Sequence, residues 1–211
     1  MKKLEIKPLL LSLGLVIFQS SLYALSKLLQ SSPTLIGNVI DSKIPFNIYF
    51  IIPYAIWYLM LFIIPYIYYK KDKKLFTKYF LSYIFMTVIA NIIFVAFPTT
   101  VNRPEVTGTN IIELLTRLIF WVDTPILNCF PSLHCAIAFA WILFTTSSKN
   151  INTKTKIITS IISLTIIYST LAVKQHVVID AISGILLASI VFLYLYFESK
   201  LTDKTKKILK I

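Results

Sequence analysis

Long apolar runs separated by short polar segments dominate the chain. A helix needs about 20 predominantly apolar residues to cross a bilayer. Six stretches qualify, of which the fourth and fifth are near the lower limit of length: Pro8–Leu29, Asn47–Tyr69, Tyr79–Phe97, Ser132–Ser147, Ile157–Val173 and Ala181–Phe197. This pattern predicts an all-α polytopic membrane protein in which about six transmembrane helices form a bundle.

Composition supports the same fold class. Hydrophobic residues make up 57% of the 211 positions, and the mean hydropathy is +0.78. That is too apolar for a soluble domain of this size. No internal repeat or low-complexity segment divides the chain, so we expect one integral membrane domain over residues 1–211.

The net charge of +12 is distributed unevenly. Sixteen of the 21 basic residues fall in four short blocks, which alternate with loops poor in lysine: Lys2, Lys3 and Lys7; Lys70 to Lys78; Lys149 to Lys156; and Lys200 to Lys210. Cytoplasmic loops carry such an excess of Lys and Arg. We therefore expect a multi-pass protein of the plasma membrane with both termini in the cytoplasm. The basic blocks would act as topology signals and contacts to membrane lipids, and no nucleic-acid partner is expected.

The chain has only two histidines, and both are predicted at the outer ends of membrane segments. His176 precedes Asp180 by four residues, which places the two side chains on one face of a helix. A carboxylate bonded to one ring nitrogen fixes the tautomer and supports charge on the other nitrogen. The pair is therefore typical of an activated histidine nucleophile or base. Taken alone, it fits equally well an interfacial histidine beside a helix-end aspartate.

The other histidine follows a predicted helix start at Pro131-Ser132. Proline suits the first turn of a helix, whose free N–H groups bind anions, and the Ser132 hydroxyl would add a donor. His134 beside such an anion can give a proton to a leaving group. The alternatives are that Ser132 only caps the helix and that His134 only lies at the interface.

Arg103 is one of two arginines in a chain with 19 lysines. Its guanidinium indicates bidentate binding of an oxyanion, although a solvated loop cation is the alternative. It lies in the longest outer segment, Thr99 to Phe130, which also contains an amphipathic helical pattern over Ile111–Val122. We expect that helix on the outer leaflet, with a surface ion pair between its Glu113 and Arg117 four residues apart. Asp123 either caps a turn or approaches the site.

Together these motifs resemble the type 2 phosphatidic acid phosphatase superfamily of integral membrane enzymes. The family pattern is Lys-x6-Arg-Pro, then Pro-Ser-Gly-His, then Ser-Arg-x5-His-x3-Asp. Here it reads Arg103-Pro104, Pro131-Ser132-Leu133-His134 and Ser169-Thr170-x5-His176-x3-Asp180. The resemblance covers residues 99–184, and the order, spacing and six-helix topology all fit.

The resemblance implies a role for each matched residue. His176 would attack phosphorus and form a phosphohistidine, and Asp180 would orient it. His134 would protonate the leaving oxygen, while Arg103 and Ser132 would hold the phosphoryl oxygens. No cofactor or metal is implied, because no cluster of Asp and Glu is available to bind an ion.

Two cations of the family pattern are absent. The first-motif lysine falls at Ala96 and the third-motif arginine at Thr170. Lys174, close to His176, is the candidate substitute for phosphate binding, and an interfacial anchor is its alternative role. The Pro-Ser-Leu-His and Gln-His forms look closer to the branch that contains inositol phosphorylceramide synthases, which transfers lipid headgroups.

The sequence therefore predicts a metal-independent enzyme that cleaves a lipid phosphate or diphosphate at the outer membrane face. Candidate substrates include phosphatidic acid, phosphatidylglycerol phosphate and polyprenyl diphosphate. The alternative is a headgroup phosphotransferase that uses the same site with an alcohol acceptor. A non-catalytic lipid-phosphate binder or transporter is a further alternative, although a transporter would be expected to carry polar residues at midmembrane. Two cysteines, Cys129 and Cys135, are expected as small apolar fillers, with a disulfide as the alternative.

Overall fold

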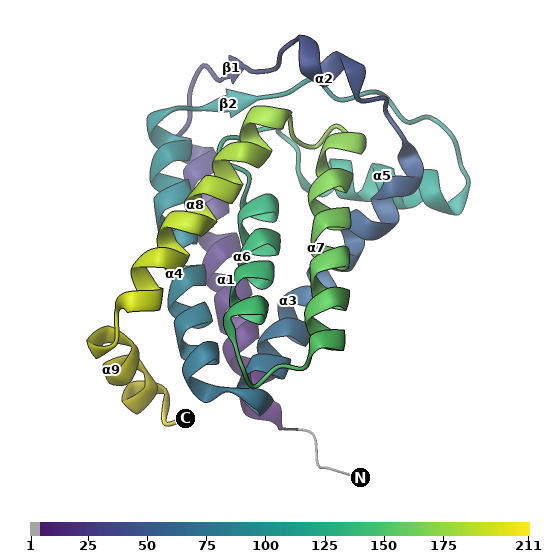
Figure 1. Cartoon of the computed structure of the whole chain (residues 1–211). Helices are drawn as coiled ribbons and strands as arrows, with labels where there is room; N and C mark the ends of the chain where they lie inside the picture. The colour runs from purple at the N-terminus through teal and green to yellow at the C-terminus, as the bar shows by residue number, and fades with distance from the viewer. Residues whose placement is uncertain (1–4) are drawn as a thin grey trace.

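Six helices pack into a bundle (Figure 1). In the computed structural model, which describes residues 5–211, five of them are long and apolar enough to cross a membrane, and α6 is a shorter apolar helix. The bundle consists of α1 (Ile6–Leu29), α3 (Ile51–Lys71), α4 (Lys73–Ala96), α6 (Leu133–Ser147), α7 (Thr153–Ala172) and α8 (Val178–Phe197). These helices correspond to the six predicted apolar stretches and confirm the predicted all-α membrane fold.

Shorter elements lie at the two ends of the bundle (Figure 1). They are β1 (Thr34–Leu35), α2 (Val39–Lys43), a 3-10 helix η1 (Ile48–Phe50), β2 (Thr99–Thr100), α5 (Ile111–Val122) and α9 (Lys200–Leu209). We call the end with β1, β2, α2 and α5 the loop end. The opposite end, with α9 and the turns α3–α4 and α6–α7, is the basic end. The parallel strands β1 and β2 join the α1–α3 loop to the α4–α5 loop at the loop end.

Side-chain caps explain where several helices begin. Asp72 accepts a hydrogen bond from the backbone N–H of Leu75 (2.9 Å), so α4 begins at Lys73, before the apolar stretch that marks it in the sequence. At α5, the carboxylate of Glu113 accepts from the backbone N–H of Asn110 (3.0 Å) and completes a capping box. Glu113 therefore caps its helix. The predicted ion pair between Glu113 and Arg117 does not form, so that prediction was wrong.

Helix α6 lies at the centre of the bundle, between α8 and α4 on one side and α7 on the other (Figure 1). Its Trp141 is fully buried, and the indole N–H donates to the Tyr79 hydroxyl (2.9 Å). The hydroxyl of Tyr68 donates to the Trp141 carbonyl (3.0 Å) and contacts Thr145 (2.8 Å). Because all four side chains are buried, these bonds satisfy polar groups that would otherwise be costly to bury.

A glycine allows α6 and α8 to approach closely at the loop end. A Cβ on Gly184 of α8 would collide with the backbone carbonyl of Ser132 and lie 3.1 Å from the backbone nitrogen of Ala136. Backbone atoms cannot move aside as a flexible side chain can. Only glycine therefore fits at this crossing, which sets the distance between the starts of α6 and α8.

We expect Gly184→Ala to destabilise the protein by about 1–3 kcal/mol, the usual cost of overpacking a tight contact. The matched control is Gly14→Ala in α1, where an added Cβ meets no atom within 4 Å. That change should be neutral or slightly stabilising, because alanine favours helices. Thermal unfolding in detergent measures both variants, and equal melting temperatures would contradict the close crossing.

Candidate active site

His176 lies in the short connection between α7 and α8. Its backbone N–H and that of Gln175 both donate to the carbonyl of Thr170 (3.1 and 3.0 Å), which folds the connection back onto α7. The imidazole Nδ1 is 3.3 Å from Oδ2 of Asp180. Only 8% of His176 is exposed and Asp180 is fully buried. The structure thus brings together the two residues that the sequence paired by their spacing.

The pairing arises in a different way from the one expected. His176 precedes α8, so the two residues do not share a helical face. Instead Asp180 is in the first turn of α8, where its Oδ2 also accepts the backbone N–H of Val177 (3.1 Å). The carboxylate therefore holds the backbone at the helix start and the histidine ring together.

His134, the second residue of α6, is packed against aromatic side chains of α3. Its ring lies 4.8 Å from the ring of Tyr54 and 4.2 Å from that of Trp57, measured between centroids. The ring of His176 is 5.8 Å away on another side. The two histidines of the chain, 42 positions apart in sequence, are therefore neighbours at the loop end.

Ser132 links the two halves of this site through its backbone. Its N–H donates to the carbonyl of Asp180 (3.0 Å), and its Oγ accepts the backbone N–H of Cys135 (3.2 Å). The hydroxyl is thus the cap of α6, the alternative role that the sequence left open for it. The Ser132 side chain is fully buried and does not line the cavity described below.

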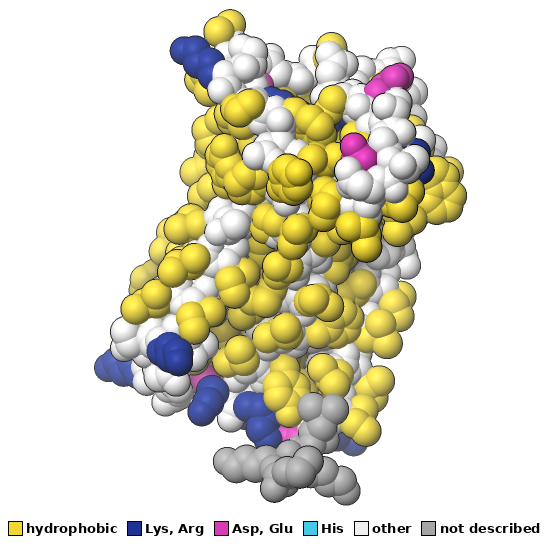
Figure 2. Space-filling view, turned by 90° about the vertical axis from the view of Figure 1, so that its right-hand side faces the viewer, with side chains coloured by type: hydrophobic (Ala, Val, Ile, Leu, Met, Phe, Trp, Pro, Cys, Tyr) yellow, Lys and Arg dark blue, Asp and Glu magenta, His cyan; other side chains and the backbone are white. Residues whose placement is uncertain are grey.

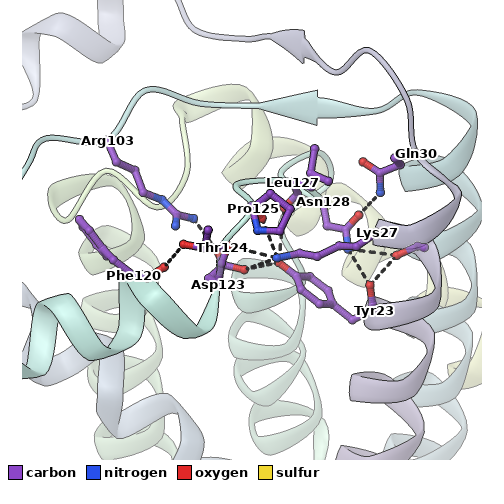
Figure 3. Close-up of polar contacts among 11 residues, drawn as sticks. Tyr23, Lys27, Gln30, Arg103, Phe120, Asp123, Thr124, Pro125, Leu127 and Asn128 are labelled. Atoms are coloured by element: carbon purple, nitrogen blue, oxygen red, sulfur yellow. Dashed lines mark hydrogen bonds and ion pairs between the residues drawn. The ribbon is translucent and has the colours of Figure 1, made fainter.

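Arg103 follows β2, and one of its terminal nitrogens, Nη2, donates to Oδ2 of Asp123 at the end of α5 (Figure 3). The guanidinium lies over the ring of Phe120, 5.3 Å from its centroid. Burial alone would raise the pKa of Asp123, but the charges of Arg103 and Lys27 and the Tyr23 hydroxyl outweigh it and hold that pKa below its usual value. Asp123 thus approaches the site, one of the two roles considered for it.

These side chains surround a cavity of about 260 Å³. Its polar lining includes Gln19, Ser20, Arg103, Asp123, Asn128, Gln175 and both histidines, and aromatic and aliphatic side chains with Cys129 cover the rest. Three of these lining residues carry four buried nitrogens that have no hydrogen-bond partner within the described residues: Nε and Nη1 of Arg103, Nε2 of His134 and Nε2 of Gln175. A buried donor left unpaired costs roughly 1–3 kcal/mol. Because the unpaired atoms of Arg103 and Gln175 are donors only, the cavity is suited to an oxyanion.

Lys174 is not brought to this cavity. Its backbone is left-handed (φ 57°), and its ammonium group donates to the carbonyls of Asp41 (2.9 Å) and Ile44. It lines a separate pocket at the loop end, together with Arg103 and residues around α2. The geometry therefore favours a structural role in holding the connection before His176, and not the phosphate contact expected from the sequence.

Neither cysteine takes part in a disulfide. Cys129 and Cys135 are both free and buried, as expected for small apolar fillers. Burial raises the pKa of the Cys129 thiol to about 12, so it stays protonated at neutral pH. Thr170, in place of the third-motif arginine, donates from its hydroxyl to the carbonyl of Ile167 (2.8 Å) and has no charge to offer an anion.

Sequence reasoning missed Lys27, Tyr23 and Gln175. Lys27 and Tyr23 are on α1, far in sequence from every motif, and they contact Asp123 (Figure 3). A lysine in the last turn of an apolar helix is the usual interfacial anchor, so nothing in the pattern singled it out. Gln175 had a weak signal, since it directly precedes His176.

The model of the PAP2 superfamily matches residues 74–202 of the chain. The match begins in α4 and ends in α9, so it contains Arg103, Ser132, His134, His176 and Asp180 and leaves α1 and α3 outside. No curated protein and no solved structure matches the chain.

Proposed function

Because the chain belongs to the PAP2 superfamily, we propose that it is a membrane lipid-phosphate phosphatase that works through a phosphohistidine on His176. The membership confirms the resemblance of the motifs at the level of the superfamily, whose members are usually phosphatases or phosphotransferases. The observation that carries the proposal is the convergence of both histidines and the unpaired donors of Arg103 and Gln175 on one cavity.

In the first step, Nε2 of His176 attacks the phosphorus of a lipid phosphomonoester or diphosphate. The Nδ1–H group donates to Asp180, which leaves the lone pair on Nε2 for the attack. As the N–P bond forms, the bond from phosphorus to the lipid oxygen breaks. His134 gives that oxygen a proton, so the lipid leaves as a neutral alcohol or as the shortened phosphate.

Arg103 and Gln175 supply donors to the nonbridging phosphoryl oxygens, whose charge their N–H groups stabilise. In the second step a water oxygen attacks phosphorus, its proton passes to His134, and the N–P bond breaks. Phosphate is released and both histidines return to their starting states. Ser132 acts on this chemistry through the backbone, by fixing the start of α6 against α8.

A headgroup phosphotransferase remains the second candidate. The observation that favours it is Leu133, which replaces the glycine of the usual Pro-Ser-Gly-His motif and lines the cavity. An apolar wall beside His134 disfavours water and suits an acceptor with a hydrocarbon part. The chemistry would be the same, with an alcohol oxygen in place of water in the second step.

A panel of lipids tests the proposal. Purified protein in detergent is given phosphatidic acid, phosphatidylglycerol phosphate or polyprenyl diphosphate, with and without a diacylglycerol or ceramide acceptor. Release of inorganic phosphate from one of these lipids without an acceptor supports the phosphatase. A new lipid product that forms only with an acceptor would establish the transferase instead. Binding of the lipids with neither product would favour a non-catalytic binder or transporter.

The orientation that we propose places the loop end outside the plasma membrane and both termini in the cytoplasm. Hydrophobic side chains cover the middle of the face in view, and the Lys and Arg side chains in view lie toward the two ends of the molecule (Figure 2). The basic end holds Lys70 to Lys78, Lys149 to Lys156 and α9. The positive-inside tendency therefore supports a cytoplasmic basic end and an active site that faces outward.

We expect an impermeant thiol reagent to label Thr107→Cys on intact cells and to label Lys149→Cys only after permeabilisation. Both positions are exposed, the first in the β2–α5 loop and the second in the α6–α7 turn. The native cysteines are buried, so the unsubstituted protein is the control for background labelling. The reverse labelling pattern would contradict the orientation.

A further inference from the structure

Helix α1 contributes Gln19 and Ser20 to the cavity lining, and Lys27 ties the same helix to the segment around Asp123. Its ammonium group donates to the Asp123 carbonyl (3.1 Å), to Asp123 Oδ1 (3.2 Å) and to the Pro125 carbonyl (2.8 Å). An ammonium group has three N–H donors, so all of them are used. Lys27 cannot contact a substrate without giving up one of these bonds, and its side chain is only 13% exposed. Lys27 therefore affects the site indirectly, by holding the segment that contains Asp123 and Pro125.

Asp123 stands between α1 and Arg103 (Figure 3). Its Oδ1 accepts from Lys27 and from the Tyr23 hydroxyl (2.6 Å), and its Oδ2 accepts from Arg103. One carboxylate oxygen thus accepts hydrogen bonds from α1, and the other accepts one from Arg103. Asn128 is a second connection between α1 and the α5–α6 loop. Its side-chain N–H groups donate to the Tyr23 carbonyl and to Ser26 (both 3.0 Å).

Arg103 is consequently fixed in two directions. Asp123 accepts from Nη2, and the guanidinium lies over the ring of Phe120. Nε and Nη1 stay buried without a partner among the described residues, and Arg103 lines the cavity. The guanidinium does not need to reorganise when a phosphoryl group arrives, which is the condition for strong electrostatic stabilisation.

We propose that Asp123 is a positioning residue for Arg103, held by Lys27 and Tyr23, so that α1 completes the phosphoryl-binding wall. The inference rests on the proposed function for the identity of the anion. It assigns a role to a helix outside the region that the family model matches. It also accounts for a site with one arginine where the family pattern has three cations, because this arginine is held in place before the substrate binds.

The test compares Asp123→Asn, Lys27→Gln and the double variant in the lipid-phosphate assay. We expect Asp123→Asn to lower kcat/KM about 10- to 100-fold, the usual effect of a misplaced binding group, mainly by raising KM. Lys27→Gln should act in the same direction but less strongly. Because Lys27 works through Asp123, the double variant should be no worse than Asp123→Asn. Asp123→Glu should restore part of the loss.

Lys70→Gln is the matched control. Lys70 also ties α1 to the rest of the protein, through Glu5 (2.5 Å), but at the basic end. We expect the Lys70→Gln variant to have the same KM as the unsubstituted protein. Tyr23→Phe removes one bond to Asp123 and leaves the charges in place, so it still tests the inference if Asp123→Asn does not fold. We expect a modest rise in KM for that variant.

A second readout does not require turnover. Inorganic phosphate should raise the melting temperature of the unsubstituted protein, and Asp123→Asn should need at least tenfold more phosphate for the same shift. An active protein in which Asp123→Asn leaves KM and the phosphate effect unchanged, or speeds turnover, overturns the inference. Additive losses in the double variant would also contradict it. If no lipid releases phosphate but the melting shift behaves as expected, the proposed function fails and the role of Asp123 stands.

Discussion

His176→Ala is expected to reduce phosphate release by about 10³-fold or more, the scale seen when a covalent nucleophile is removed. The reason is that Nε2 forms the bond to phosphorus, and the only other imidazole in the chain, on His134, belongs to the proton-transfer side of the site. The assay is phosphate release in detergent from whichever lipid the panel identifies. Brief incubation with a substrate labelled in its phosphate should also leave label on the unsubstituted protein and none on the variant.

The variant should remain folded and should still bind inorganic phosphate. Arg103 and Gln175 keep their donors, and His176 lies in the connection between α7 and α8, outside the helices of the bundle. An unchanged melting temperature with phosphate-dependent stabilisation is therefore the control that separates lost chemistry from lost structure. Substantial activity in His176→Ala, or label that stays on it, would exclude His176 as the nucleophile.

Asp180→Asn is expected to lower kcat by about 10³- to 10⁴-fold, with little change in KM. A neutral amide in this position cannot stabilise the positive charge that develops on the ring when Nε2 bonds to phosphorus. The backbone bond to Val177 can survive, because the amide oxygen still accepts it. The steady-state split between kcat and KM is the measurement, since a merely loosened site would raise KM as well.

Asp41→Asn is a matched control for that variant. The Asp41 carboxylate also accepts a backbone N–H at the start of α8, from Val178 (2.7 Å), but Asp41 lies in α2 and belongs to the separate pocket at the loop end. It should cost some stability and leave kcat within a few-fold of the unsubstituted protein. Equal losses of kcat in the two variants would mean that Asp180 acts only as a helix cap.

The fold was predictable because lipid imposes a simple rule on the chain. A spanning helix must be apolar over most of its length, so each run in the sequence marks one helix of the bundle. The predicted ends of the helices were less accurate, because polar caps such as Asp72 extend a helix past its apolar part. The strands β1 and β2 have two residues each, too few for any alternation to appear.

The site was predictable only in part. His134, His176, Asp180 and Arg103 stand out because such residues are scarce in this chain, and the structure places all four at the loop end. Lysine is common here, and its spacing does not show which ammonium groups snorkel to the interface and which are buried partners. Lys174 was therefore favoured for its closeness in sequence to His176, while the lysine that reaches Arg103 through Asp123 lies on α1.

The length of α6 bears on how deep in the membrane the proposed reaction would take place. Its 15 residues span about 22 Å, against about 36 Å for the 24 residues of α4. The lower end of α6 is level with the α3–α4 turn, because Ser148 and Asn150 both donate to Asp72 (3.1 and 3.0 Å). His134, the second residue of α6, therefore lies about 15 Å below the upper end of α4 if the two helices run parallel. In the proposed function, a lipid would have to lower its phosphate toward the hydrocarbon region to react, so we expect a thinner bilayer to favour turnover.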